Sequence, residues 1–213
     1  MDFLDEKLSA YVDAHTQNEP GLLQELNRET WAKILMPRML SGHLQGQVLA
    51  MFSKMIQPSR ILEIGTYTGY SALCLAEGLS ADGKLYTIDI NEELEEIVQR
   101  YIKSSPFADK IVTMIGDATK LIPGIAETFD IVFIDADKEN YSKYFDLVID
   151  KVRKGGFIIA DNVLWSGNVL KAAADMDDET KAIDSYNKKV MQDPRVENVL
   201  FPIRDGLMVA RKI

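Results

Sequence analysis

The first 57 residues carry apolar side chains at the spacing of helices. Leu8, Tyr11 and Val12 recur at this spacing, and residues 48–56 repeat the pattern. Apolar residues three and four apart share one face of a helix, which can then pack on a neighbouring element. The pattern predicts a helical N-terminal extension over residues 1–57.

From Arg60 onward, short runs rich in Ile and Val alternate with helix-like stretches. The runs lack polar alternation, and a turn and a helical pattern follow each of them, which is typical of parallel strands buried on both faces. The runs are residues 60–65, 84–89, 110–116, 129–135 and 155–161. The helix-like stretches lie near residues 69–80, 91–104, 118–126 and 138–153.

Two further strand candidates, residues 195–203 and 207–213, come at the end of the sequence. Only Arg204–Gly206 separates them, so they predict an antiparallel hairpin at the edge of the sheet. The expected fold is therefore α/β, with a seven-stranded, mostly parallel sheet whose last strand is reversed and helices on both faces.

The composition favours one soluble domain. At 213 residues, with no repeat and no Gly/Ser/Pro-rich linker, the chain predicts a single domain of residues 1–213. Within it, residues 1–57 would cover the site and residues 58–213 would form the core. The net charge of −9 disfavours a nucleic-acid partner, because phosphates would be repelled over most of the surface.

The cellular location is also suggested by composition. The single cysteine, Cys74, excludes an intrachain disulfide and fits a reducing compartment. No apolar run approaches the roughly 20 residues that span a bilayer. The acidic, amphipathic first 15 residues do not resemble a signal peptide. We therefore expect a cytoplasmic protein.

Acidic residues recur where the predicted strands end. Ligands of open parallel sheets bind beyond the carboxyl ends of the strands. Any single acid there also fits the capping of a helix. Together, however, five of them at one edge predict a ligand site: Glu63, Asp89, Asp117, Asp135 and Asp161.

The turn after the first strand predicts the kind of cofactor. Gly65 and Gly69 allow a sharp turn and a close approach of backbone to a ligand. A dinucleotide site needs further glycines to make room for the pyrophosphate, but Tyr67 and Tyr70 occupy those positions. S-adenosylmethionine (SAM) has no pyrophosphate, so this loop favours SAM over NAD.

Asp89 ends the second strand 24 residues after Gly65. An acid at this spacing can accept hydrogen bonds from both ribose hydroxyls of a nucleoside cofactor. The alternative is that Asp89 caps the helix that opens at Asn91, a role that Asn91 itself could also fill. Asp117 and Ala118, after the third strand, would lie near the adenine.

Asp135, Asp161 and Asn162 form a candidate metal site. Neighbouring parallel strands lie about 4.8 Å apart, so these side chains would meet at one edge. Two adjacent carboxylates repel unless a proton or a cation lies between them. Their oxygens and an amide oxygen suit Mg²⁺, with Mn²⁺ or Ca²⁺ as alternatives. No His or Cys accompanies them, so zinc and copper are not expected.

Lys138 is the candidate general base. It lies three residues after Asp135 at the start of a helix, so its amine can reach back over the cation. A partly buried lysine beside a divalent cation suits proton abstraction, and the alternative is a solvated surface lysine. Trp165 is a candidate for lining an acceptor pocket.

Six segments together resemble a known family: ILEIGTYTGYSAL, YTIDIN, GDA, FIDADK, ADNVLWSG and DGLMVARK. The chain resembles the metal-dependent O-methyltransferases of the caffeoyl-CoA and catechol type, and the pairing of FIDADK with ADNVLW is specific to them. The resemblance implies a Rossmann-like class I SAM methyltransferase fold and a homodimer. It also implies methyl transfer from SAM to a hydroxyl of a small catechol-like or phenylpropanoid-like acceptor.

The resemblance also implies residue roles. It places Asp135, Asp161 and Asn162 on the metal, and Lys138 and Asp135 in catalysis. Around SAM it places Met39, Ser41, Glu63, Gly65, Tyr67, Ser71, Asp89, Ala118, Asp135 and Asp137. In one respect the chain departs from the catechol branch, because Met208 stands where that branch has a glutamate that fixes the second hydroxyl. Animal-type catechol specificity is therefore not expected.

Three other functions remain open. The first is methylation of a hydroxyl on a wobble uridine of tRNA, which the acidic balance disfavours. Four basic residues offer a local patch for it: Lys33, Arg38, Lys54 and Arg60. The second is an NAD-dependent oxidoreductase, which Tyr67 and Tyr70 disfavour. The third is a non-catalytic SAM-binding domain, which retention of the metal ligands and Lys138 disfavours.

Overall fold

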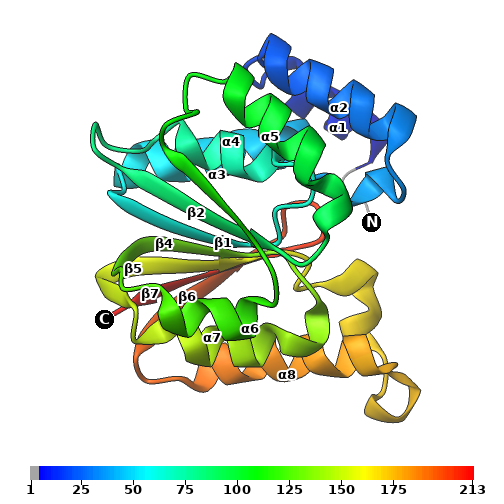
Figure 1. Ribbon diagram of the computed structural model, residues 1–213. Coiled ribbons are helices and arrows are strands. Elements are labelled where there is room, and N and C mark those ends of the chain that lie inside the picture. Colours follow the sequence, from blue (N-terminus) through cyan, green and yellow to red (C-terminus); the bar gives the residue numbers. More distant parts are fainter. Residues whose placement is uncertain (1–4) are drawn as a thin grey trace. The chain divides into compact units, whose positions relative to one another are not determined.

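Seven strands form one sheet in the order β3-β2-β1-β4-β5-β7-β6 in the computed structural model (Figure 1). The structure describes residues 5–213, so the first four residues of the acidic N-terminal segment lie outside the described residues. The strands are β1 (Arg60–Ile64), β2 (Lys84–Asp89), β3 (Ile111–Ile115), β4 (Phe129–Ile134), β5 (Val152–Ala160), β6 (Val196–Phe201) and β7 (Leu207–Lys212). The predicted seven-stranded α/β sheet is confirmed.

The strand pairing confirms the reversed last strand. Strand β2 is parallel to β3, and β4 is parallel to β5. Strand β7 is antiparallel to both β5 and β6, so β6 and β7 form the predicted hairpin at the sheet edge. Within this pairing, Met208 lies opposite Ala160, the residue before Asp161.

Contacts within the chain define two compact units. The N-terminal unit contains residues 5–61 and 66–117, and the C-terminal unit contains residues 62–65 and 118–213. None of the helices in residues 5–213 is both long enough and apolar enough to cross a membrane.

The N-terminal unit is helical up to residue 56, as predicted. Its helices are α1 (Glu6–Ala14), α2 (Gly21–Lys33), α3 (Gly42–Ile56), α4 (Tyr70–Ala76) and α5 (Glu95–Ser104), with 3₁₀ turns η1 (Pro37–Met39) and η2 (Glu92–Leu94). Asp5 begins α1 by accepting hydrogen bonds from the backbone N–H groups of Lys7 and Leu8.

Helix α4 ends four residues before the predicted stretch does, and its close packing on α3 gives the reason. The Ser53 hydroxyl of α3 donates to the Leu75 carbonyl at 2.6 Å. Just beyond α4, the backbone of Gly78 lies so near that of Ser53 that an added Cβ would be 2.1 Å from its carbonyl carbon. Only glycine fits here, because any side chain would meet backbone.

The C-terminal unit holds strands β4, β5, β7 and β6, with helices α6, α7 and α8 along one side of them (Figure 1). Its helical elements are α6 (Ala118–Leu121), η3 (Ile122–Gly124), η4 (Lys138–Asn140), α7 (Tyr141–Ile149), η5 (Trp165–Leu170), η6 (Ala173–Asp175) and α8 (Asp178–Gln192). The predicted helix near 138–153 stops at Ile149, because Val152 pairs with Phe129 and already belongs to β5.

Candidate active site

The register of β4 and β5 brings two carboxylates to one edge of the C-terminal unit. Ile134 lies opposite Ala160 in the parallel pair, and the backbone N–H of Asp161 donates to the Ile134 carbonyl at 3.0 Å. Asp135 and Asp161 are the residues that follow these strand ends. They therefore lie side by side where the strands leave the sheet, as their positions in the sequence predict.

The ammonium of Lys138 joins the groups at this edge. Its Nζ donates to Asp135 Oδ1 at 3.1 Å, to Asn162 Oδ1 at 2.9 Å and to the Tyr141 hydroxyl at 2.6 Å. The Lys138 side chain is only 9% exposed, so the alternative of a solvated surface lysine is wrong. We call Asp135, Lys138, Tyr141 and Asn162 the Lys138 cluster.

Tyr141 is the member of the Lys138 cluster that was not predicted from the sequence. Its side chain is fully buried, and its hydroxyl donates to the Asp161 carbonyl at 3.0 Å while accepting from Lys138. Burial raises its pKa well above the usual tyrosine value, and the nearby carboxylates of Asp135 and Asp161 add to the effect. Tyr141 therefore stays a neutral hydroxyl. Its spacing of one helical turn from Lys138 is a signal in the sequence.

The segment after Asp161 has unusual backbone conformations. Asn162, Trp165 and Ser166 have φ values of 59°, 45° and 52°, in the left-handed region that side chains rarely adopt. The carboxylate of Asp205 in the β6–β7 turn accepts from the Ser166 backbone N–H and so holds this segment. The Trp165 ring lies 5.7 Å from Lys138 Nζ. Such strain commonly persists at functional sites.

Further predicted cofactor residues lie in the C-terminal unit. Gly65 has a φ of +101°, and an added Cβ would be 1.9 Å from the Asp135 carbonyl oxygen, so only glycine fits. Glu63 is fully buried in β1, and Ala118 is buried at the start of α6. The carboxylate of Asp137 accepts from the Tyr144 hydroxyl and from the Asn140 side-chain amide.

The N-terminal unit contains a small pocket at the carboxyl ends of β2 and β3. Asp89 accepts from the Tyr67 backbone N–H at 2.7 Å and from the Asn91 backbone N–H at 2.8 Å. Asn91 itself caps η2 through the Glu93 N–H, so capping does not fall to Asp89. The pocket is lined by Thr66, Tyr67, Asp89, Asn91, Leu94, Glu95, Val98, Thr113, Met114 and Ile115.

Tyr67 also connects this pocket to the end of the helical N-terminal segment. Its hydroxyl donates to the carbonyls of Leu35 and Met36 at 3.2 and 3.3 Å. Two predicted cofactor residues follow in that segment, Met39 half exposed and Ser41 buried. Ser71, also predicted around the cofactor, is buried in the first turn of α4.

The oxygens of the Lys138 cluster suit a cation chemically. Asp135 and Asn162 each direct an oxygen to one ammonium group, so they already converge on a positive charge. No group of three or more His, Cys, Asp or Glu side chains within residues 5–213 is arranged to hold a metal. A site here would consist of two carboxylates and one amide, which is a donor set for Mg²⁺, Mn²⁺ or Ca²⁺ and not for zinc.

Comparisons with known proteins identify the family of this chain. Residues 13–213 match a family model described as O-methyltransferase. The chain belongs to the O-methyltransferase family. It is 38% identical over 206 residues to the caffeoyl-CoA O-methyltransferase of Petroselinum crispum, covering 92% of this chain and 85% of that one.

Two solved structures show what similar folds bind. An O-methyltransferase from Bacillus cereus in complex with S-adenosylhomocysteine (SAH), the demethylated product of SAM, is 28% identical, with a TM-score of 0.89 and 97% of each chain covered. The SAH-bound methyltransferase PaMTH1 of Podospora anserina is 27% identical, with a TM-score of 0.89 and 98% and 94% of the two chains covered.

This chain is thus a SAM-dependent O-methyltransferase with the class I fold, as the sequence predicts. The NAD-dependent oxidoreductase and the non-catalytic SAM-binding domain are excluded by the family. An O-methyltransferase transfers the methyl group to an oxygen, so the acceptor of this enzyme carries a hydroxyl group.

Proposed function

We propose that the enzyme methylates a hydroxyl of a small aromatic acceptor, catechol-like or phenylpropanoid-like, held by a divalent cation beside Lys138. The observation that carries this proposal is the convergence of Asp135, Tyr141 and Asn162 on the Lys138 ammonium. The similarity to a caffeoyl-CoA O-methyltransferase supports the acceptor class.

Asp135, Asp161 and Asn162 would hold the cation, most simply Mg²⁺, with Mn²⁺ or Ca²⁺ as alternatives. When bound, a divalent cation polarises an acceptor hydroxyl and lowers its pKa. Asp161 is buried and accepts from the Asn162 backbone N–H at 2.7 Å, and the Asn162 amide oxygen accepts from Lys138, so these protein oxygens are oriented in advance. Pre-positioned ligands lower the cost of ordering when a ligand binds.

In the reaction, Lys138 in its neutral amine form accepts the proton of the acceptor hydroxyl at Nζ. The acceptor oxygen then forms a bond to the methyl carbon of SAM while the methyl–sulfur bond breaks and SAH remains. The proton passes from Lys138 to water. Tyr141 holds Nζ in place through its hydroxyl, and the Trp165 ring lies 5.7 Å from this amine.

The cofactor assignment remains a proposal for each residue. In the N-terminal unit, Asp89 would accept hydrogen bonds from the ribose hydroxyls, because two backbone N–H groups already orient its carboxylate. The further proposed contacts in that unit are Met39, Ser41, Tyr67 and Ser71. Those proposed in the C-terminal unit are Glu63, Gly65, Ala118, Asp135 and Asp137.

Met208 supports an acceptor other than an animal-type catechol. Its side chain is 2% exposed, and it lies opposite Ala160 next to the proposed metal ligand Asp161. A thioether cannot replace a carboxylate that fixes a second hydroxyl, because sulfur is only a weak acceptor. The same reasoning allows a phenylpropanoid-like diol that reaches the cation through both oxygens.

The tRNA alternative loses much of its proposed basic patch. Lys33 pairs with Glu29 and Lys54 pairs with Glu77, so two of the four charges are neutralised locally. Arg60 donates to backbone carbonyls. We propose a small-molecule acceptor for this reason. We also propose a homodimer, from the resemblance, and a cytoplasmic location, from the composition.

Labelled SAM tests this proposal. We expect label in phenylpropanoid or catechol acceptors, loss of transfer in excess EDTA, and recovery on adding Mg²⁺. Label in bulk tRNA instead would identify the alternative acceptor. Binding of Mn²⁺ alone, measured by calorimetry, should weaken in Asp161→Asn but not in Glu197→Gln, a surface variant. Undiminished transfer in EDTA would refute the metal role.

A further inference from the structure

We propose that Glu29 is a positioning residue for SAM binding, because it fixes α2 against α5 and thereby supports the loop that carries Tyr67. Glu29 is not one of the residues that we propose to hold the acceptor or the cation. The inference rests on the proposed role of Tyr67 and Asp89 in cofactor binding.

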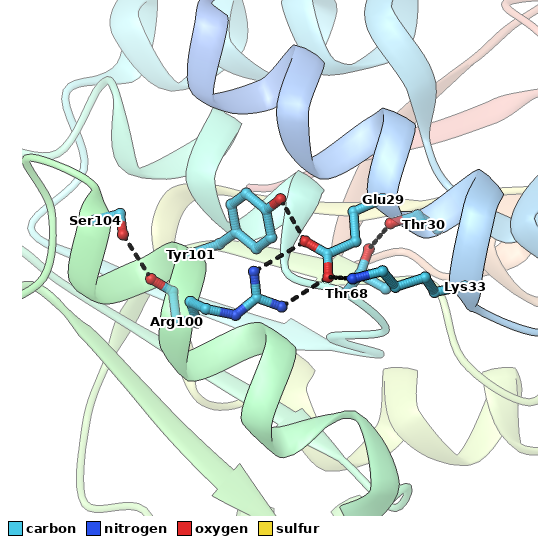
Figure 2. A network of polar contacts seen from close by, with 7 residues as sticks. All are labelled: Glu29, Thr30, Lys33, Thr68, Arg100, Tyr101 and Ser104. Carbon is cyan, nitrogen blue, oxygen red and sulfur yellow. Dashed lines mark hydrogen bonds and ion pairs between the residues drawn. The ribbon is translucent and has the colours of Figure 1, made fainter.

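Four donors from two helices converge on the Glu29 carboxylate (Figure 2). Arg100 of α5 donates two parallel hydrogen bonds, to Oε2 and Oε1, each at 2.9 Å. The Tyr101 hydroxyl donates to Oε2 at 2.8 Å, and Lys33 of α2 donates to Oε1 at 3.0 Å. We call Glu29, Lys33, Arg100 and Tyr101 the Glu29 cluster.

The Glu29 cluster differs from an ordinary surface ion pair. The Glu29 side chain is only 16% exposed, and a two-point contact with a planar guanidinium fixes direction as well as distance. Arg100, Tyr101 and Lys33, in this order, hold the pKa of the Glu29 carboxyl well below its usual range. The carboxylate therefore stays charged, and α2 cannot slide along α5 without breaking these bonds.

Contacts lead directly from this fixed helix to the loop. The residue after Glu29, Thr30, is fully buried, and its hydroxyl donates to the Thr68 hydroxyl at 3.3 Å (Figure 2). Beyond α2, the carbonyls of Leu35 and Met36 accept from the Tyr67 hydroxyl. Residues on both sides of the end of α2 thus contact consecutive residues of the loop.

The backbone of Tyr67 is held at the pocket. Its backbone N–H donates to Asp89, the proposed ribose ligand, and Tyr67 itself has a left-handed φ of 49°. A tyrosine in this conformation needs support from its surroundings. If α2 moves, the Tyr67 hydroxyl loses its acceptors, and SAM must order the loop as it binds. The expected consequence is weaker SAM binding with an unchanged rate at saturation.

Glu29→Gln and Arg100→Lys test the proposal. We expect each variant to raise the Kd for SAH, measured by calorimetry, by roughly three- to tenfold. The KM for SAM should rise with it while kcat stays within about twofold, because the reacting groups are untouched. Arg100→Lys keeps the charge and removes the two-point contact, so it remains informative if Glu29→Gln folds poorly.

Glu77→Gln is the matched control. Glu77 is a similarly shielded carboxylate, 21% exposed, and it pairs with Lys54 of α3 instead of bridging α2 and α5. This variant should leave the Kd for SAH unchanged. An equal loss of affinity in Glu77→Gln and Glu29→Gln would show a general loosening of the unit and overturn the proposal.

Two outcomes separate this inference from the proposed cofactor site. If Asp89→Asn weakens SAH binding and Glu29→Gln lowers only the melting temperature, the cofactor site stands and the positioning role of Glu29 is refuted. If Asp89→Asn leaves the Kd for SAH unchanged, the cofactor site itself is wrong, and the inference fails with it.

Discussion

Two carboxylates in this enzyme, Glu29 and Asp135, have opposite surroundings. Glu29 accepts from three side chains, and its donors belong to regular helices. Asp135 follows a strand end, and within the described part of the chain Lys138 is its side-chain donor. Both acids pair with a cationic side chain, but only Asp135 keeps acceptor capacity for a ligand. If Asp135 binds a ligand as proposed, the number of donors around each acid distinguishes the structural contact from the binding group.

The backbone conformation also differs between the Glu29 cluster and the Lys138 cluster. The Glu29 cluster lies on α2 and α5, where all conformations are helical. The Lys138 cluster includes Asn162 in the left-handed region, followed by Trp165 and Ser166 in similar conformations. Regular helices fix a position at little cost, whereas a strained turn directs side chains to one point and depends on the surrounding contacts.

The largest expected effect comes from removing the proposed base. Lys138→Met should lower kcat by about a hundred- to ten-thousandfold, since a positioned base contributes this much. Steady-state rates with labelled SAM measure the loss. Lys143→Met, an exposed lysine on α7, is the control and should keep its rate. A Lys138→Met enzyme of normal rate would place the base elsewhere.

Removing the hydroxyl that holds Lys138 should have a smaller effect. Tyr141→Phe should lower kcat roughly ten- to a hundredfold, because groups that orient a reacting side chain matter by this amount. SAH affinity should not change. Tyr186→Phe is the matched control: its ring packs edge-on against Tyr141, and its hydroxyl has no hydrogen-bond partner within residues 5–213. Equal losses in both variants would point to packing instead.

The stability of the Glu29 cluster should depend on pH. Glu29→Gln should lower the free energy of unfolding by about 1 kcal/mol at pH 7, through loss of charged hydrogen bonds. The folded pKa of Glu29 is depressed, so its contribution is fully present above the usual glutamate pKa of about 4.3 and is lost as pH falls further. Urea unfolding at pH 7 and pH 3.5 should therefore show a smaller difference from wild type at pH 3.5. A difference that grows in acid would contradict this explanation.

The smallest effect is expected for an exposed pair. Glu197 and Arg211 face each other across β6 and β7 with side chains 64% and 46% exposed. Glu197→Gln should change the free energy of unfolding by less than about 0.5 kcal/mol, because solvent screens such pairs. Thermal melting of wild type and Glu197→Gln in low and high salt measures this change in stability. A loss as large as that of Glu29→Gln would remove the distinction between fixed and exposed ion pairs.

Much of the fold is readable from local patterns. Runs rich in Ile and Val mark the first five strands, and burial on both faces removes polar alternation from β1 and β4. The short turn at residues 204–206 marks the hairpin of β6 and β7. The ends are less readable: α7 stops at Ile149 because pairing with Phe129 draws Val152 into β5. The acids at the strand ends are also readable from the sequence. Parallel strands run in the same direction, so residues at their carboxyl ends lie at one edge of the sheet.

The candidate site is only partly readable. Lys138 is visible in the sequence because it lies three residues after Asp135, and Tyr141 lies another helical turn along. Nothing local marks Glu29, because its donor Arg100 lies 71 residues away. A glutamate four residues before a lysine on a helix has the same local sequence whether or not an arginine of another helix also donates to its carboxylate.

The sequence by itself determined the strands, the glycine turn and the family, because each depends on residues that are close along the chain. The tertiary structure alone decided which carboxylates are saturated with donors and which keep acceptor capacity. It also decided that the Lys138 ammonium, Asp135 and Asn162 meet, since strand register and a left-handed turn set that convergence. The physical reason is that a hydrogen bond depends on the distance between two groups in the folded chain. Partners that are distant in sequence produce no periodic pattern from which the bond could be predicted.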